Sequence, residues 1–597
     1  MAFQDFDQIT ERRKAENARK FKRRILIAVI AVILLIGIIV GAIFVVNKLK
    51  TDKATKKASK PASPSPKRDR PDNNAPPPND KPATASKIVE QMCGSTDYQD
   101  KCKEVFSVKK EPVSKPKEVI KAIISGASDE AKSAFTKAGE LSFEKEEEKQ
   151  AFEDCKTLFD DAKEELEESV YQVGNTTSSG KMRIGLMNSW LSAVISYGQT
   201  CIDGFPDGDA KSKLTKTLEA TKELTSNSLA VISLLSEVKV PGTEASSGSS
   251  RRLLAQNKDG FPSWLTHDER RVLKRNDEKP TPNVTVAKDG SGNYQSISEA
   301  LSAMPENYEG RYIIYVKEGV YDESVTVTKK MPNVTIYGDG SQKSIITGNQ
   351  NTADGVRFLK TATFVAIGEG FIAKSMGFRN TAGSAKQQAV AARVVADRAV
   401  FLNCRFEGYQ NTLFVQAHRQ FYKSSVVSGT IDFIIGDAAA IFQNCLIYIR
   451  KPQENNSNTV TAQGRTDKRE TTGIVLQNCK ILPDKDFESD KSQFKSYLGR
   501  PWKEYSRTIV MESTIDNVID QEGWKEMDGD FGKKTLFYGE YNNNGDGSKT
   551  DNRVKWPGVK VLNKDEAMQF TVGPFLKGNA WLKNNNGVPV RFGLFDN

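Results

Sequence analysis

The sequence predicts a multidomain protein: an N-terminal membrane helix, an all-α bundle and then a right-handed parallel β-helix. Three observations lead to this prediction. Ile25–Val46 is an uncharged apolar run, residues 87–238 carry apolar side chains at spacings of three and four, and residues 281–597 alternate short β-rich runs with Gly, Asn and Asp turns. A chain of 597 residues is long enough for two to four domains.

The apolar run at 25–46 is long enough to cross a bilayer as a helix. A basic tail at 1–24 precedes it, which favours a cytoplasmic N-terminus. No small-x-small cleavage site follows, so we expect a signal anchor rather than a cleaved signal. Residues 47–86 are rich in Lys and Pro with few apolar residues, which predicts a disordered linker. The rest of the chain is expected to enter the secretory pathway.

The charge balance points to a polyanionic partner. The formal net charge is +10 and the isoelectric point is about 8.9, which suits nucleic acid, anionic lipid or an acidic polysaccharide. The alternative is that basic tails and linkers supply the excess, and much of it does lie between residues 11 and 70.

The seven cysteines contain no CxxC spacing, so a zinc or redox site is not expected. Cys93 and Cys102 are close enough in sequence to staple a helical hairpin, and Cys155 and Cys201 could join two long helices. Four cysteines allow three connectivities, so this pairing stays open. Sequons for N-glycosylation, which a secretory protein can use, begin at four asparagines: Asn175, Asn283, Asn333 and Asn455.

The helical region at 87–238 carries short motifs of a known family. It opens with a C-x8-C spacing, places Asp154 before Cys155 and contains the run TCIDGF at 200–205. These features resemble the plant invertase and pectin methylesterase inhibitor domain. The resemblance implies a four-helix bundle stapled by disulfides.

The region at 281–597 repeats the dipeptide Asn-Cys, at Asn403-Cys404, Asn444-Cys445 and Asn478-Cys479. The spacing fits one or two coils of about 20 residues, as in a solenoid. We expect the cysteines to be unbridged core residues and the asparagines to form a hydrogen-bonded ladder. A β-sandwich is the alternative.

The stretch at 403–437 carries polar residues that packing does not require: Gln410, Asn411, His418, Arg419, Asp432 and Asp437. Asp432 lies between apolar neighbours, and a carboxylate there is costly to bury unless it is paired or used. Gln388 precedes Gln410 by 22 residues, and Asp432 follows Gln410 by the same number. In stacked coils these three residues would lie on adjacent rungs, about 4.8 Å apart.

The same region resembles the plant pectin methylesterases across nearly its whole length. The motifs are GNYQSISEAL from Gly292, GFIAKSMGFRNTAG from Gly370, QAVAARV from Gln388, GYQ-TL-RQFY from Gly408, GT-DFI-G from Gly429 and LGRPW from Leu498. The resemblance implies that Asp432 attacks the methyl ester, that Gln388 and Gln410 stabilise the oxyanion, and that Arg500 orients the nucleophile. It also implies substrate contacts from Trp502 and from Phe358, which replaces a family threonine.

One implied residue is absent. The proton donor of the family is an aspartate in GYQDT, and this chain has Asn411 there. An amide cannot transfer a proton, and losing a general acid–base costs about 10²–10⁴ in rate. The family asparagine five residues after the nucleophile is Asp437 here. Asp437 is therefore the first candidate for the acid that replaces the missing proton donor, and His418 is the second.

The predicted function is hydrolysis of pectin methyl esters in cell-wall modification, without a cofactor, a metal or nucleic acid. A catalytically impaired relative that binds pectin or regulates another esterase is the first alternative, and a polygalacturonase is the second. The junction at 239–280 contains Arg251-Arg252-Leu253-Leu254. The resemblance implies that a protease releases the pro-region there, although a plain basic loop is also possible. The bundle is a candidate inhibitor of the esterase, within the chain or in trans.

Overall fold

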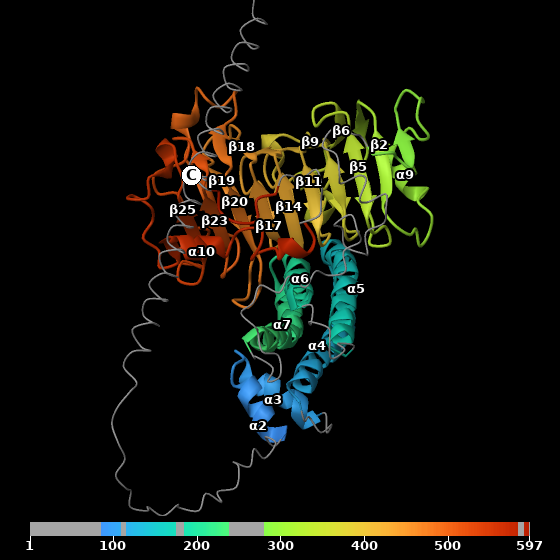
Figure 1. Cartoon of the computed structure of the whole chain (residues 1–597), viewed down its shortest axis with the longest axis vertical. Coiled ribbons are helices and arrows are strands. Elements are labelled where there is room, and N and C mark those ends of the chain that lie inside the picture. The colour runs from blue at the N-terminus through green and yellow to red at the C-terminus, as the bar shows by residue number, and fades with distance from the viewer. Residues whose placement is uncertain (1–84, 109–114, 175–183, 238–279, 583–589, 596–597) are drawn as a thin grey trace, which may run out of the picture. The chain divides into compact units, whose positions relative to one another are not determined.

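The computed structural model describes residues 85–108, 115–174, 184–237, 280–582 and 590–595 (Figure 1). The predicted membrane helix at 25–46 and the predicted cleavage site at 251–254 lie outside these residues. Across the described segments, no helix is both long and apolar enough to span a bilayer.

The helical region contains a four-helix bundle and a short helical hairpin. In the bundle α4 packs on α5 and α7, and α6 also packs on α5 and α7. Apolar side chains at spacings of three and four, such as Ile120, Ile123 and Ile124, fill its core. The six helices are α2 (Ala85–Cys93), α3 (Gln99–Val108), α4 (Pro116–Gly139), α5 (Glu146–Gly174), α6 (Ile184–Asp203) and α7 (Asp209–Glu237).

Two disulfides tie these helices together. Cys93–Cys102 joins α2 to α3, and Cys155–Cys201 joins α5 to α6. Both pairings that the sequence suggested are confirmed, and the other two connectivities are excluded.

The region from residue 280 onward is a parallel β-helix with three sheets, which rules out the β-sandwich. The first sheet has 11 strands: β1 (Val284–Val286), β2 (Tyr312–Val316), β5 (Val334–Gly338), β8 (Ile372–Lys374), β11 (Ala399–Leu402), β14 (Arg419–Lys423), β17 (Ala439–Gln443), β20 (Gly473–Gln477), β23 (Arg507–Met511), β25 (Phe537–Tyr541) and β26 (Val559–Val561). The second has seven: β4 (Val325–Val327), β7 (Phe364–Ala366), β10 (Ala392–Val394), β13 (Leu413–Val415), β16 (Ile434–Gly436), β19 (Asn458–Gln463) and β22 (Ser496–Pro501). The third has eight: β3 (Gly319–Asp322), β6 (Ser344–Gly348), β9 (Gly377–Asn380), β12 (Arg405–Glu407), β15 (Val426–Gly429), β18 (Leu446–Ile449), β21 (Lys480–Pro483) and β24 (Thr514–Ile515).

Between β2 and β24 each coil contributes one strand to each sheet, so a strand there pairs with the strand three places further along the chain. Thus β10 pairs with β13, and β13 pairs with β16. Parallel crossovers are right-handed in nearly all proteins, so a right-handed helix remains the prediction. The shorter helices are α9 (Ile297–Ser302), α10 (Lys564–Met568), η1 (Phe358–Lys360), η2 (Ser384–Lys386), η3 (Lys491–Gln493), η4 (Asp546–Ser548) and η5 (Gly578–Ala580).

The repeated Asn-Cys dipeptide marks one corner of the coil. The residue at this corner has a positive φ of 47–57° in seven coils: Ser375, Asn403, Ser424, Asn444, Asn478, Glu512 and Asn542. Asparagine tolerates this left-handed conformation better than most residues. Cys404, Cys445 and Cys479 are unbridged and buried in the core, as predicted.

The predicted asparagine ladder is wrong. Ser424 occupies the corner between Asn403 and Asn444, so the three asparagines are not on consecutive rungs. The described residues show no hydrogen bond between their side chains; Asn444 instead accepts one from Lys423. Backbone conformation explains the repeat.

Candidate active site

Asp432 lies two residues before β16, an interior strand of the seven-stranded sheet, and is 4% exposed. Its backbone has a positive φ of 50°, a conformation that is costly for a non-glycine residue and is often found at functional sites. The backbone N–H of Asp432 donates to Thr459 Oγ1 at 2.9 Å. This contact to the next rung holds the residue in place.

The carboxylate of Asp432 is held by two side chains. Arg500 donates from Nε to Oδ1 at 2.8 Å and from Nη2 to Oδ2 at 2.6 Å. Thr459 donates its hydroxyl to Oδ1 at 2.6 Å. Such a bidentate pair fixes both position and orientation. Burial lowers the pKa of Arg500, but the adjacent carboxylate outweighs burial and raises it overall. The prediction that Arg500 orients Asp432 matches this geometry.

Gln388 and Gln410 occupy successive rungs beside Asp432. They form a parallel bridge with each other, as the 22-residue spacing predicted. Both are partly exposed, and within the described chain neither side-chain amide has a hydrogen-bond partner. Two free N–H donors on adjacent rungs can stabilise a developing oxyanion.

Asn411 is 1% exposed and lies one rung from Asp432. Its backbone N–H donates to the carbonyl of Ile431 at 3.0 Å, and its Nδ2 donates to the carbonyl of Asp432 at 3.2 Å. The side-chain oxygen is buried without a partner. The side chain therefore lies beside the backbone of Asp432, and an amide there can donate or accept hydrogen bonds but cannot transfer a proton.

The outward face of the seven-stranded sheet continues from Asp432 as an apolar surface. Phe414, Ile435 and Ala462 lie in register with Arg500 and cluster with Phe358 and Trp502. The ring of Phe358 lies 5.1 Å from that of Phe414, and Trp502 lies 6.4 Å from it, edge to face. Phe414 is buried, whereas Phe358 and Trp502 are partly exposed, so the rings of these two can stack on the face of a sugar.

Asp437 lies at the other end of β16 from Asp432. Four residues lie between them, and five residue steps span at most roughly 16 Å along a strand. Oδ1 of Asp437 accepts hydrogen bonds from Gln463 at 2.9 Å and Thr472 at 2.5 Å. This placement does not bring Asp437 to the ester site, so it does not support the hypothesis that Asp437 is the substitute acid.

Asp437 instead faces a second buried carboxyl group, Glu470. Both are almost fully buried, and each has one carboxyl oxygen without a partner by ordinary hydrogen-bond geometry. Burial raises the pKa of Asp437, and burial together with Asp437 raises that of Glu470. The pair therefore retains a proton to a higher pH than an isolated carboxyl group.

His418 faces the helical bundle rather than Asp432. Its Nε2 lies 3.0 Å from the hydroxyl of Tyr197 and 3.3 Å from Glu165, and its Nδ1 lies 3.3 Å from Ser189. All three partners are bundle residues. Because both ring nitrogens are engaged there, His418 is not placed as a substitute acid.

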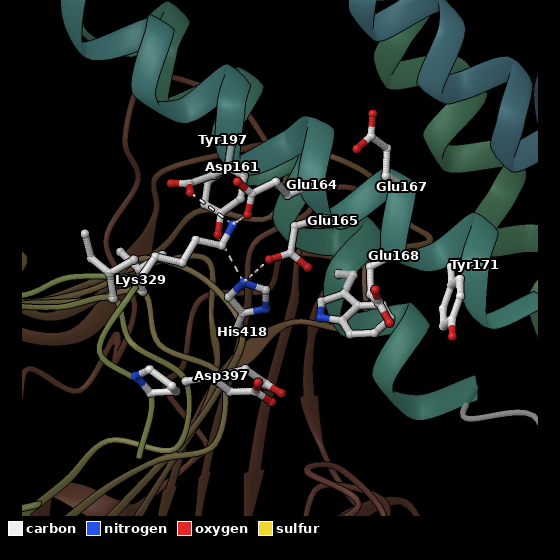
Figure 2. Close-up of a pocket in the computed structure, with 15 residues that line it drawn as sticks. Asp161, Glu164, Glu165, Glu167, Glu168, Tyr171, Tyr197, Lys329, Asp397 and His418 are labelled. Carbon is white, nitrogen blue, oxygen red and sulfur yellow. Dashed lines mark hydrogen bonds and ion pairs between the residues drawn. The ribbon is translucent and has the colours of Figure 1, made fainter. Parts of the chain in front are cut away.

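Figure 2 shows the cavity around His418, between α5 and turns of the β-helix. It measures about 590 Å³, and Asp432 is not among the residues that line it. Lys329 crosses it, with Nζ 3.2 Å from Asp161 and 2.7 Å from Glu164. Burial lowers the pKa of Lys329, but these carboxylates raise it overall. The cavity is thus part of an ionic contact between the two regions.

Two contacts of the bundle lie next to the apolar surface. Oδ2 of Asp154 in α5 lies 2.6 Å from Nη1 of Arg357, which precedes Phe358 in sequence. Oδ1 of Asp203 in α6 lies 2.6 Å from Nζ of Lys503, which follows Trp502 in sequence. The bundle is therefore attached on both flanks of the predicted substrate contacts.

Sequence reasoning did not identify Thr459 and Glu470. Thr459 lies in the run NTVTAQ, which is typical of an ordinary strand. It follows Asp432 by 27 residues, whereas the expected coils have about 20 residues. Glu470 lies in a loop whose partner is set only by the fold. Asp437 and Glu470 are far apart along the chain, so no sequence signal linked them.

The sequons differ in accessibility. Asn283 and Asn455 are exposed, and Asn333 is partly exposed. Asn175 lies outside the described residues.

Comparisons with known proteins match both regions. The family model described as Pectinesterase matches residues 283–579, and the one described as Plant invertase/pectin methylesterase inhibitor matches residues 87–231. The Arabidopsis thaliana proteins named pectinesterase/pectinesterase inhibitor 45 and 13 are 48% and 47% identical, over 100% of this chain and 100% of each relative. A pectin methylesterase structure from carrot is 48% identical, with a TM-score of 0.52, and covers 53% of this chain and 99% of its own.

The carboxyl pair leads to a prediction about stability. Because the folded chain binds the shared proton more tightly than the unfolded chain, stability should fall as pH rises above the ordinary carboxyl range of about 4. Asp437→Asn keeps both accepted hydrogen bonds and lets Glu470 ionise beside an amide donor. We expect this variant to be more stable than wild type at pH 7 by roughly 1 kcal/mol, and less dependent on pH.

Urea unfolding at pH 4.5, 6 and 8 measures this difference. Asp486→Asn, at an exposed aspartate, is the matched control and should follow wild type. Parallel pH dependences for wild type and Asp437→Asn would contradict the prediction.

Proposed function

Because the chain belongs to the pectinesterase family, we propose that it hydrolyses methyl esters of homogalacturonan in pectin and releases methanol. It is a pectinesterase with an N-terminal inhibitor-like domain. The observation that carries the proposed chemistry is the Asp432 carboxylate, held by Arg500 and Thr459 beside two free amides. A single carboxylate clamped by a cation suits attack on an ester. A glycosidase would need two carboxyl groups flanking the bond.

In the proposed reaction, one carboxylate oxygen of Asp432 attacks the ester carbonyl carbon of a methyl galacturonate. The carbonyl oxygen becomes an oxyanion, and the N–H groups of Gln388 and Gln410 stabilise it. The C–O bond to the methoxy group breaks, and methanol leaves after taking a proton. Water then hydrolyses the acyl–Asp432 anhydride, which releases the galacturonate carboxylate and restores Asp432.

The proton transfers are the unusual part of this scheme. In the described part of the chain, no second carboxyl group hydrogen-bonds to Asp432 or occupies the rung of Asn411. We propose that water supplies the proton to methanol, and that the unpartnered oxygen of Asn411 accepts a hydrogen bond from the water or alcohol. The chain would then be an active but slow esterase. No cofactor or metal ion is part of the proposal.

The bundle is proposed as an inhibitor within the chain. Its acidic residues hold Arg357 and Lys503 on the two flanks of the apolar surface. Two aromatic residues next to them, Phe358 and Trp502, are the proposed pectin contacts. A bundle attached at both flanks would restrict the access of a long polysaccharide to Asp432.

The cellular setting is also a proposal. The apolar run at 25–46 would anchor a precursor in the membrane of the secretory pathway, and cleavage at Arg251–Leu254 would release the esterase to the cell wall. Two disulfides in the bundle and exposed sequons at Asn283 and Asn455 support an oxidising, glycosylating compartment.

The nucleophile is tested by Asp432→Asn. The variant keeps the shape of the side chain but removes the attacking charge, so we expect methanol release from methyl-esterified homogalacturonan to fall by roughly 10⁴-fold or more. The assay uses the full-length chain, before and after proteolysis of the junction. Asp551→Asn, at an exposed turn, is the control. A fall of less than tenfold in Asp432→Asn would reject Asp432 as the nucleophile.

The missing acid is tested by Asn411→Asp. This change restores a group that can transfer a proton on the rung beside Asp432, so we expect kcat to rise by about 10²-fold. Asn403→Asp is the matched control, because Asn403 also has a positive φ but lies at a corner away from the site. An unchanged or lower kcat in Asn411→Asp would show that the site does not use an acid at this position.

The attachment of the bundle should depend on pH through His418. Burial lowers the pKa of His418, but the Glu165 carboxylate raises it above the usual value of about 6.5. The contact is therefore fully formed below pH 6.5 and weakens as pH rises through the raised pKa. We expect His418→Gln to release methanol roughly tenfold faster than wild type at pH 5, and at a similar rate at pH 8.

Glu165→Gln should reproduce this effect, because it removes the other partner. His267→Gln, at the only other histidine in the sequence, is the control. If the ratio of variant to wild-type rate is the same at both pH values, the His418 contact does not regulate the enzyme.

A further inference from the structure

A second cavity lies within the helical region, where residues of α4, α6 and α7 line it. It measures about 230 Å³, which is more than the roughly 150 Å³ of a cavity that holds one benzene molecule. The apolar part of its lining consists of Phe135, Val194, Ile195, Ile202 and Leu218. The cavity can therefore enclose an apolar body the size of one ring with a short chain.

One polar atom of the lining has no partner in the described part of the chain. The hydroxyl of Thr221 in α7 is buried without a hydrogen bond, and the residue is 6% exposed. A threonine in a helix commonly donates to the carbonyl four residues earlier, as Thr225 does to Thr221. An unsatisfied buried hydroxyl costs about 1–3 kcal/mol. A bound molecule that offers a hydrogen bond would remove this cost.

Two carboxyl groups of α7 also line the cavity. Glu219 is exposed and Glu223 is partly exposed, and within the described segments neither forms an ion pair. They are four residues apart on one helix, where like charges repel. Burial raises the pKa of Glu223 and the Glu219 carboxylate raises it further, while Lys101 and Lys222 offset this only in part. A cation from outside the chain would relieve this repulsion.

The cavity joins three parts of the molecule. Tyr98 lines it from just before α3 in the helical hairpin, and Thr466 lines it from the β-helix. Burial raises the pKa of the Tyr98 hydroxyl to about 12, and the carboxylates of Asp467 and Glu223 add to this effect. Negative charge therefore comes from both regions, and a molecule held there contacts the hairpin, the bundle and the β-helix together.

We propose that this cavity binds a small organic amine whose apolar body is about the size of one aromatic ring. The body lies against Phe135 and the neighbouring aliphatic side chains, and an aromatic body can stack on that ring. An ammonium group has three N–H donors, and the lining offers three acceptors: Glu219, Glu223 and the Thr221 hydroxyl. The bound amine strengthens the contact between the bundle and the β-helix, because it touches both. The site is separate from the ester chemistry and does not rest on the proposed function.

The test uses the full-length chain and 2-phenylethylamine, a probe with one ring and one ammonium group. Its binding is measured by calorimetry at low salt, and we expect a Kd of about 0.1–1 mM. Phenylacetate carries the same ring with the opposite charge, and methylamine carries the charge without the ring. Each should bind about tenfold more weakly or less, because it lacks one of the two contributions.

Two conservative variants locate the site. Glu223→Gln removes one carboxylate and keeps the size of the side chain, so the affinity for 2-phenylethylamine should fall about tenfold. Thr221→Val keeps the shape of the side chain without its acceptor, so the affinity should fall about fivefold. Thr221→Val should also raise the thermal midpoint of the unbound chain, because no unsatisfied hydroxyl remains. Glu147→Gln, at an exposed glutamate of α5, is the control and should bind as the wild type does.

The proposal is overturned if the wild type does not bind the probe or binds phenylacetate equally well. Wild-type affinity in both Glu223→Gln and Thr221→Val would overturn it too. The link between the two regions is measured by hydrogen exchange, which the probe should slow in residues 465–472 as well as in α7. Unchanged exchange in 465–472 would show that the amine does not strengthen the contact with the β-helix.

Discussion

The stacking of parallel coils, with neighbouring strands about 4.8 Å apart, is the constraint on which the site depends. It brings residues that are far apart in sequence into contact: Gln388 forms a bridge with Gln410, and Asn411 donates a hydrogen bond to the backbone of Asp432. Arg500 reaches Asp432 from 68 residues downstream. Coil length varies, because Leu413 pairs with Ile434 whereas Thr461 pairs with Gly499. The additional residues lie in the turns, so the alternation of side chains within each strand is kept.

The sequence predicted those parts of the structure that regular spacing determines. The coil length gave the adjacent rungs of Gln388 and Gln410, and the spacing of apolar residues gave the bundle. The prediction failed where closeness in sequence does not mean closeness in space. Asp437 is close to Asp432 in sequence but lies at the opposite end of β16. It also failed between domains, because nothing near His418 in sequence indicates that Glu165 and Tyr197 are its partners.

The two departures from the family motifs have separate physical consequences. Asn411 removes a proton-transferring group from the reacting side of the sheet while keeping a hydrogen bond to the backbone of Asp432. Asp437 adds a carboxyl group on the side where the 465–472 loop begins, and there it faces Glu470. That loop also contacts the helical hairpin of α2 and α3, since Arg469 Nε donates to Asp97 Oδ2 at 2.6 Å. The gained acid therefore affects the loop and its contacts rather than the ester chemistry.

The described bundle holds two cations that an acidic polysaccharide would also attract, because both present carboxylates. Asp154 and Asp203 neutralise Arg357 and Lys503 beside the aromatic contacts, and a demethylated polysaccharide offers carboxylates of the same charge. Under the proposed function, carboxylates released by demethylation would compete with Asp154 and Asp203 for these two cations, so the product would act against the attachment of the bundle.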